Sequence, residues 1–566
     1  MSVAAKSDAP SQGPRRGNRS PFLPKGRQVD PEALEEIRLL LGDRPRNRDL
    51  LIEHLHLIQD NFNQVSAAHL AALAEEMSLA MTEVYEVATF YHHFDVVKED
   101  DTAPAALTVR VCDGIACEMK GADDLLMALG KRYGSGDVRV VHAPCVGACD
   151  RAPVAVVGQR QVFEADDAAV SNAVDGGQIQ PDRPDYKTFD AYVADGGYGV
   201  WKTCLDGSQA RETVIATVDG SGLRGLGGAG FPTGRKWGFL KDAPKPRLVA
   251  INADEGEPGT FKDRYCFETD PHRVLEGSLI AAWAVEAEAV YIYLRDEYPQ
   301  IHELLLTEIA RLEQENLTGG IELHLRRGAG AYICGEESAM LESIEGKRGL
   351  PRNRPPFPAQ AGLFGHPTLI NNVETMYWIA DIVENGAEWY GDQGRPHFYS
   401  VSGRVKEPGV KLAPAGVTVR QLIFEHCGGM EDGHTFNAYL PGGASGGLLP
   451  ADKGDAPLDF GSLDEFGCFI GSSAVVVFSN TDSVRDICKN LLHFFEYESC
   501  GQCTPCRVGC EKMLKLIDAP SWDGDLIREL SDTMRDASIC GLGQAAPNPV
   551  LSALRFFPAD VSGDVK

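Results

Sequence analysis

The feature that most constrains this sequence is the spacing of its cysteines. Three of them, Cys500, Cys503 and Cys506, occur within seven residues in the string ESCGQCTPC. A structural zinc site usually takes two thiolates from each of two knuckles, whereas three thiolates separated by two residues suit three corners of a 4Fe–4S cube. The spacing therefore favours a 4Fe–4S cluster over zinc near the carboxyl end of the chain.

A cube needs a fourth thiolate, and two cysteines compete for that role. Cys510 completes the C-x2-C-x2-C-x3-C spacing of bacterial ferredoxins, but there the fourth cysteine serves a second cluster. No other ligands remain here for a second cluster of that kind. Cys540, in the string SICGLG, is therefore the better candidate.

A second group of cysteines lies nearer the amino end. Cys112 and Cys117 form a C-x4-C pair in VCDGIAC, and Cys145 and Cys149 form a C-x3-C pair in APCVGAC. Both pairs follow predicted strands, and two thiolates per iron suit a 2Fe–2S rhomb. Zinc remains the alternative, and with zinc in both groups the chain would be a non-catalytic scaffold.

Charge and hydropathy exclude several classes of protein. The 566 residues include 54 Lys and Arg against 82 Asp and Glu, a net charge of −28 that repels nucleic acid. The most apolar stretch, 279–294, is interrupted by Glu286 and Glu288, so no membrane span is expected. The amino-terminal basic residues have no apolar core behind them, which is unlike a secretory signal. Clustered thiols in such a chain indicate a reducing cytoplasm.

Hydrophobic periodicity divides the chain into segments of different kinds. Strands at 247–252, 289–294 and 321–326 alternate with helical patterns, which predicts a largely parallel sheet in the longest segment. The predicted segments are a flexible tail (1–28), a helical bundle (29–100), a small α/β domain (101–182), a parallel α/β domain (183–392), a β-rich module (393–482) and a helical domain (483–566).

The stretch SGLRGLGGAGFPTGRKW is rich in glycine. Gly225, Gly227 and Gly228 leave bare backbone N–H groups that can approach a phosphate closely, and Lys236 adds a cation. No clear strand precedes the stretch, so it is not an ordinary Rossmann fingerprint. It predicts a phosphate-binding loop, with a flexible surface loop as the alternative.

Polar residues follow the predicted strand 247–252. Asn252, Asp254 and Glu255 stand where parallel strands end, the usual place for ligands in such sheets. A second glycine-rich turn, GAGAYICGEESAM, adds Glu336 and Glu337. These residues predict hydrogen bonds to a sugar or a ring, although a solvated acidic turn would look similar.

Together these strings, with LINNVET, resemble the NADH-binding flavoprotein subunit of respiratory complex I over residues 190–560. They also resemble its relatives in NAD-reducing hydrogenases and NAD-dependent formate dehydrogenases. Residues 29–180 resemble the thioredoxin-like 2Fe–2S subunit, which is a separate chain in complex I. That fusion argues against a complex I subunit. From PKGRQVDP to MRDASICGLGQA the chain is most similar to the β subunit of tungsten- or molybdenum-dependent formate dehydrogenases.

The resemblance implies a multidomain α/β protein. Its parts would be the helical bundle, a thioredoxin-like 2Fe–2S domain, a Rossmann-like FMN and NAD domain, a β-grasp insert and a helical 4Fe–4S domain. The implied partners are NAD⁺/NADH and a molybdopterin α subunit that oxidises formate, with a hydrogenase diaphorase as the alternative. Hydride transfer between FMN and NAD needs no side-chain acid or base, so no catalytic side chain is predicted.

The resemblance also implies residue roles. Residues expected to hold FMN are Gly225, Gly227, Gly228, Lys236, Asn252, Asp254, Asn371, Asn372 and Thr375. Residues expected around the dinucleotide are the aromatic Phe231, Phe239 and Phe357, then Glu255 and Gly335 near the nicotinamide, and Glu337 near the adenosine ribose. Glu336 is expected to bind the cofactor as well. The implied cluster ligands are the two cysteine pairs for 2Fe–2S, and Cys500, Cys503, Cys506 and Cys540 for 4Fe–4S.

Overall fold

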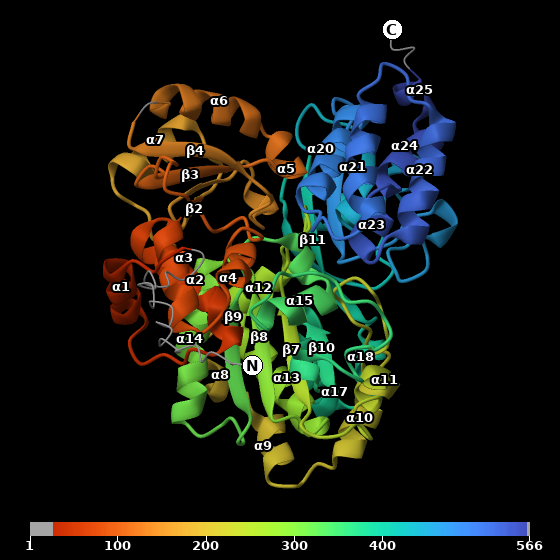
Figure 1. The fold of residues 1–566 in the computed structure, drawn as a ribbon. Helices are drawn as coiled ribbons and strands as arrows, with labels where there is room; N and C mark the ends of the chain where they lie inside the picture. Colours follow the sequence, from red (N-terminus) through yellow and green to blue (C-terminus); the bar gives the residue numbers. More distant parts are fainter. Residues whose placement is uncertain (1–26, 135, 563–566) are drawn as a thin grey trace, which may run out of the picture.

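The computed structural model describes residues 27–134 and 136–562 (Figure 1). The predicted flexible tail lies almost wholly outside the described residues. The described chain forms the predicted kinds of structure in the predicted order: helices, a small mixed sheet, a parallel sheet, a second mixed sheet and helices again. The segment boundaries themselves remain a prediction.

The amino-terminal segment is helical, as its periodicity predicts. It contains α1 (Pro31–Leu41), α2 (Leu51–Phe62), α3 (Ala67–Glu76) and α4 (Met81–Ala88). Ser66 caps α3 by accepting a hydrogen bond from the backbone N–H of His69, at 3.0 Å. Leu55 and Ile58 on α2 and Leu70 and Leu73 on α3 are fully buried. This apolar face packs into one core with the parallel sheet and the carboxyl-terminal helices.

The first mixed sheet has the strand order β4-β3-β5-β6. Its strands are β3 (Leu107–Cys112), β4 (Val138–Ala143), β5 (Ala155–Val157) and β6 (Arg160–Val162). β3 and β4 are parallel and joined through α6 (Ala122–Tyr133), while β5 and β6 run antiparallel. Cys112 ends β3, and Cys145 follows β4 by two residues. Because the two strands are parallel, both cysteine pairs begin at the same, carboxyl end of the strands.

The central sheet is entirely parallel, with the order β10-β7-β8-β9. Its strands are β7 (Leu248–Ala253), β8 (Ala289–Leu294), β9 (Glu322–Arg327) and β10 (Thr368–Asn372). The crossover helices include α13 (Pro271–Ala284) and α14 (Pro299–Gln314). The buried stripe predicted between β8 and β9 is confirmed, because Ile301, Leu304, Leu305, Ile309 and Leu312 are all buried on α14.

The remaining chain forms a second mixed sheet and a helical domain. The sheet, ordered β12-β11-β15-β13-β14, contains β11 (Pro396–Gly403), β12 (Gly409–Pro414), β13 (Phe436–Leu440), β14 (Leu449–Pro450) and β15 (Ala474–Ser479). The principal helices that follow are α20 (Val484–Tyr497), α21 (Thr504–Ile517), α22 (Gly524–Ala537) and α24 (Asn548–Phe556). Among the described residues, no helix is long and apolar enough to cross a membrane.

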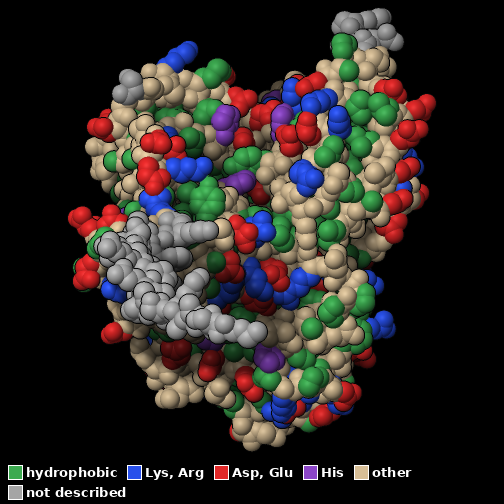
Figure 2. Space-filling model, in the orientation of Figure 1, with side chains coloured by type: hydrophobic (Ala, Val, Ile, Leu, Met, Phe, Trp, Pro, Cys, Tyr) green, Lys and Arg blue, Asp and Glu red, His purple; other side chains and the backbone are tan. Residues whose placement is uncertain are grey.

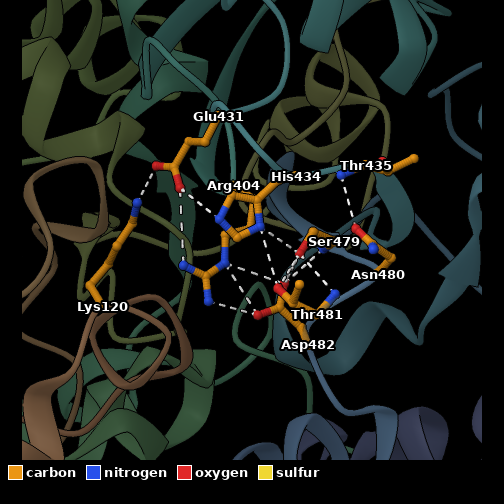
Figure 3. A network of polar contacts seen from close by, with 9 residues as sticks. All are labelled: Lys120, Arg404, Glu431, His434, Thr435, Ser479, Asn480, Thr481 and Asp482. Atoms are coloured by element: carbon orange, nitrogen blue, oxygen red, sulfur yellow. Dashed lines mark hydrogen bonds and ion pairs between the residues drawn. The ribbon is translucent and has the colours of Figure 1, made fainter.

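Polar contacts join the small α/β domain to the second mixed sheet (Figure 3). Lys120 of the small domain forms an ion pair with Glu431. Glu431 faces Arg404, whose guanidinium Nη2 lies 2.8 Å from Asp482 Oδ1. Asp482 in turn accepts a hydrogen bond from the backbone N–H of Ser479 at 2.7 Å. This chain of contacts holds two segments far apart in the sequence against each other.

Candidate functional site

The glycine-rich loop folds back onto the carboxyl end of β10. The backbone N–H of Gly225 donates to Phe231 O at 2.8 Å and closes the loop. The N–H of Leu226 donates to Thr375 Oγ1 at 2.9 Å, which fastens the loop to the segment after β10. At Gly227 an added Cβ would lie 2.9 Å from Asn372 Cβ, so only glycine fits. The loop, Asn372 and Thr375 are therefore brought together as predicted.

The carboxyl ends of β7 and β10 present two buried polar atoms without partners. Asp254 Oδ2 and Asn371 Nδ2 are inaccessible and have no hydrogen bond among the described residues. Burial raises the pKa of Asp254 well above its usual range, against the lowering effect of Arg295. Leaving such groups unpaired costs about 1–3 kcal/mol each. A polar ligand such as FMN, with ring and ribityl donors and acceptors, would satisfy them, so these residues fit the flavin.

Asn252 links this edge to the second glycine-rich turn. Its Nδ2 donates to Gly335 O at 2.8 Å, and its Oδ1 accepts from the N–H of Asp254 at 3.1 Å. Gly335 belongs to the short helix η3 (Tyr332–Gly335), and an added Cβ there would lie 3.1 Å from Asp254 O. The two turns singled out in the sequence thus meet at one point. Their contact with FMN remains a prediction.

The residues expected to hold FMN, namely the glycine-rich loop, Asp254, Asn371, Asn372 and Thr375, are called the flavin cradle below. A buried cluster of charges that was not predicted contacts this cradle. Lys262, fully buried on α12 (Lys262–Thr269), has Nζ 2.7 Å from Asp263 Oδ1 and 3.0 Å from Glu374 Oε2. Asp263 Oδ2 accepts from Asn372 Nδ2 at 2.5 Å. The cluster therefore positions a predicted flavin contact. A visible signal was the string KDR within NADEGEPGTFKDR, where a lysine stands next to an acid inside a ligand-binding motif.

Glu255 and its neighbour Asp254 have different partners. Its carboxylate accepts from the N–H groups of Asp263 at 2.8 Å and Arg264 at 3.0 Å, and from Tyr298 OH at 3.1 Å. Burial and then the charge of Asp263 raise the pKa of Glu255 to about 7. Glu255 therefore binds the start of α12, and its predicted place near the nicotinamide remains a prediction.

The aromatic residues predicted to flank the dinucleotide are unusually exposed. Phe231, Phe239 and Phe357 are 41 %, 57 % and 51 % exposed. The rings of Phe231 and Phe239 lie 5.9 Å apart at a tilt, whereas Phe357 makes no ring contact with them in the described chain. Exposed rings gain most by stacking on a planar ligand. Phe231 and Phe239 are therefore neighbours, and the stacking of the three rings on the dinucleotide remains a prediction.

The charged residues expected around the nucleotide form one group. Lys236 Nζ lies 3.9 Å from Glu337 Oε2, and Arg354 Nη2 lies 3.1 Å from Glu337 Oε1. Glu336 also forms an ion pair with Arg354, and it caps α15 (Glu337–Ile344) by accepting from the N–H groups of Ser338 at 3.0 Å and Ala339 at 2.9 Å. Glu336 therefore has a structural role in this arrangement, and its contact with a ligand remains a prediction.

The carboxyl-terminal cysteines surround one small cavity. Its lining includes Cys500, Cys503, Cys506 and Cys540, together with Ile333. Cys510 is not among the lining residues; it lies one turn further along α21 and is fully buried. Four thiols converging on one cavity are the donor set of a 4Fe–4S cluster. This placement supports the choice of Cys540 over Cys510, which remains a prediction.

The amino-terminal cysteines also converge. All four are buried, and Cys145 Sγ lies 3.3 Å from Cys149 Sγ. Gly114 packs against them so closely that an added Cβ would lie 3.2 Å from Cys145 Cβ. Four buried thiols with no disulfide fit a 2Fe–2S rhomb. Arg295 ties this group to the flavin domain, because its guanidinium donates to Cys145 O at 2.7 Å and Glu255 O at 2.5 Å.

The second glycine-rich turn connects the carboxyl end of β7, where FMN is expected to bind, to the carboxyl-terminal cysteines. Ile333 lines the cysteine cavity, and Gly335 accepts the hydrogen bond from Asn252. Two residues of chain span at most about 7 Å. The two sites therefore share one wall, which is the arrangement that electron transfer between them needs.

A cleft separates the small 2Fe–2S domain from the carboxyl-terminal helices, and Figure 2 shows the molecule hollowed there. Its lining includes Cys145 and His142 on one side and His493 and Tyr497 on the other. Asn490 of α20 bridges the two sides by donating to Asp113 O at 2.8 Å. The two domains are thus in contact beside a cleft that reaches Cys145.

Comparison with known families defines the class of protein. Family models match four segments: "Thioredoxin-like [2Fe-2S] ferredoxin" at 37–177, "Nuo51 FMN-binding domain" at 218–381, "SLBB domain" at 398–448 and "NADH-ubiquinone oxidoreductase-F iron-sulfur binding region" at 486–563. The chain is therefore a flavoprotein with an FMN-binding domain, a 2Fe–2S domain and a 4Fe–4S domain. It is of the NADH-oxidising, diaphorase type.

Individual relatives define the family. The second F subunit of NADH-quinone oxidoreductase in Rhizobium meliloti is 42 % identical over 406 residues, which cover 67 % of this chain and 94 % of that protein. The F subunit of the Aquifex aeolicus enzyme is 40 % identical over 400 residues, covering 67 % and 91 %. The chain belongs to the family of NADH-quinone oxidoreductase F subunits, extended by a thioredoxin-like 2Fe–2S domain.

A solved chain of an NAD⁺-reducing [NiFe]-hydrogenase is 32 % identical with a TM-score of 0.81, and the match covers 93 % of this chain and 95 % of that chain.

Proposed function

We propose that this chain is the diaphorase subunit of an NAD-reducing formate dehydrogenase. Its partner is a molybdopterin α subunit, with tungsten or molybdenum, that oxidises formate. The fusion of a 2Fe–2S domain to a flavin and 4Fe–4S module in one chain supports a diaphorase subunit outside complex I. The related F subunits of NADH-quinone oxidoreductase match only 67 % of this chain, so it is not a simple counterpart of those proteins.

The choice of formate rests on the sequence. The resemblance to formate dehydrogenase β subunits includes stretches outside the cofactor motifs, such as RDLLIEHLHLIQD in the helical bundle and SGRVKEPGVKLAPAG in the second mixed sheet. Segments without cofactor residues are not required by the flavin chemistry. Their resemblance is therefore a more specific sign of the whole assembly than the motifs are.

The protein's own contribution is alignment. FMN supplies the exchange between single electrons and the hydride that NAD⁺ accepts. The glycine loop, Asn372 and Thr375 fix one side of the cradle, while Asp254 and Asn371 offer free polar atoms at its floor. The exposed pair Phe231 and Phe239 stacks on the nucleotide and orients it.

A hydrogenase diaphorase is a second candidate, and one observation favours it. The match to the NAD⁺-reducing hydrogenase chain covers 93 % of this chain, which includes both iron–sulfur domains. The two candidates differ only in the partner that delivers electrons.

Purification of the native complex through an affinity tag on this chain tests the proposal. We expect formate to drive NAD⁺ reduction, hydrogen to have no effect, and a large subunit containing tungsten or molybdenum to be present. Hydrogen-driven reduction with nickel in the complex would replace the proposal by the hydrogenase assignment. If NADH reduces a dye while neither formate nor hydrogen is active, both assignments fail although the diaphorase class stands.

A further inference from the structure

A pair of histidines lies against the central sheet, beside the start of the second glycine-rich turn. His56 is on α2, and His93 is in the loop after α4. Their rings are 4.7 Å apart. Asp296 follows β8, and one donor atom from each of these three residues lies within 4.8 Å of the others. The flavin and cluster chemistry uses none of the three.

Each imidazole is held by one nitrogen and has the other free. His93 Nδ1 lies 2.6 Å from Asp296 Oδ2, and His56 Nε2 lies 2.8 Å from Gly328 O. The opposite nitrogens, His93 Nε2 and His56 Nδ1, are buried and have no partner in the described chain. If the paired nitrogens carry the hydrogens, the free ones carry lone pairs. Metal-binding histidines have this arrangement, with the second nitrogen fixed by a carboxylate or a backbone carbonyl.

Arg327 links the histidine cluster to a second carboxylate. Arg327 Nε lies 2.6 Å from Asp296 Oδ1, and its Nη1 lies 2.7 Å from Asp60 Oδ2. Asp296 is therefore held by Arg327 as well as by His93.

We propose that His56 and His93 bind a borderline transition metal ion, Zn²⁺ in the first instance, with Asp296 fixing His93 and balancing the charge. Imidazole nitrogen is a preferred ligand of such ions. A cavity of about 290 Å³ is lined by His93, Asp296 and Arg327, so the cluster borders open space. The ion joins α2 to the loop after α4, while Gly328 O and Asp296 connect the two ligands to residues that follow β9 and β8 of the central sheet.

Zinc binding to the intact protein tests this site. The holoprotein is washed with chelator and equilibrated with excess Zn²⁺. It is then desalted, and zinc and iron are counted per chain. We expect one bound zinc ion with unchanged iron, because intact clusters keep the cysteines occupied. His56→Gln and His93→Gln each lose the ion, whereas His324→Gln, at a histidine on the same sheet outside the cluster, retains it.

Zinc X-ray absorption of the loaded wild-type protein tests the site without relying on the folding of any variant. We expect nitrogen and oxygen neighbours at about 2.0–2.1 Å, including imidazole, and no sulfur shell near 2.3 Å. The proposal would be overturned if the wild type bound no zinc. It would also be overturned if His56→Gln and His93→Gln bound as much zinc as the wild type, or if a sulfur shell were present. None of these outcomes depends on whether the partner oxidises formate.

Discussion

Removing the buried ammonium of Lys262 should destabilise the floor of the flavin cradle far more than removing an exposed one. Its Nζ lies 2.7 Å from Asp263 Oδ1 and 3.0 Å from Glu374 Oε2, with all three side chains buried. Lys245 is a matched control, because its Nζ also lies 3.0 Å from a carboxylate, Glu286 Oε1, but the two side chains are 56 % and 37 % exposed. The two lysines therefore differ in burial and in the number of carboxylates they contact, two for Lys262 and one for Lys245.

The expected magnitudes follow from that difference. Deleting one partner of a buried ion pair costs about 3–5 kcal/mol, because it leaves a carboxylate buried without compensation. Deleting one partner of an exposed pair costs about 0–1 kcal/mol. Lys262→Met should therefore lower the local free energy of opening around α12 by about 3–5 kcal/mol. Lys245→Met should change the stability near Glu286 by less than about 1 kcal/mol.

Hydrogen–deuterium exchange measures this effect locally, which suits a multidomain chain without a single unfolding transition. At 1.4 kcal/mol per factor of ten, amides of α12 and of α16 (Val373–Tyr377) should exchange roughly 100-fold faster or more in Lys262→Met. Peptides around Glu286 should be nearly unchanged in Lys245→Met. Exchange in Lys262→Met within threefold of wild type would refute the reasoning.

The effect should also depend on pH in a defined direction. Burial raises the pKa of Glu374, and Lys262 opposes that rise. Without Lys262 the folded-state pKa moves further above the unfolded value, so the folded protein binds more protons and its stability falls as pH rises. The deficit of Lys262→Met relative to wild type should be smallest near pH 5 and largest near pH 8. A deficit that grows on acidification would contradict this account.

Three further predictions concern the predicted ligands. Gly227→Ala should weaken FMN binding about tenfold or more, because its Cβ would lie 2.9 Å from Asn372. Gly225→Ala should weaken FMN binding less, because its Cβ would lie 3.7 Å from its nearest neighbour. Titration of the apoprotein with flavin measures both effects. Cys540→Ser should remove about four iron atoms per chain and Cys510→Ser should remove none, as measured by iron analysis and EPR. Phe239→Ala should raise KM for NADH severalfold with little change in kcat, and an effect confined to kcat would contradict the stacking role.

The parts of the structure that could be predicted from sequence depend on neighbours along the chain. Strand β8 is apolar or aromatic at every position, and it occurs at the predicted residues 289–294. Strand β10 was not predicted, because only five residues form it and two of them are asparagines. It becomes a strand by pairing with β7, in a register that places Asn371 opposite Ile251 and Asn372 opposite Asn252. That pairing joins residues more than a hundred positions apart, which no local pattern contains.

In the candidate site, the roles of single side chains also depend on contacts that the local sequence does not contain. Asp254 and Glu255 are adjacent acids after one strand, and the sequence treats them alike. In the folded chain the surroundings of the two side chains differ. Glu255 accepts three hydrogen bonds from α12 and Tyr298, whereas Asp254 Oδ2 has no partner in the described chain. Because a buried unpaired carboxylate oxygen is costly, Asp254 is the acid with binding capacity left for a ligand, and Glu255 is the acid that holds the ligand-binding loop in place.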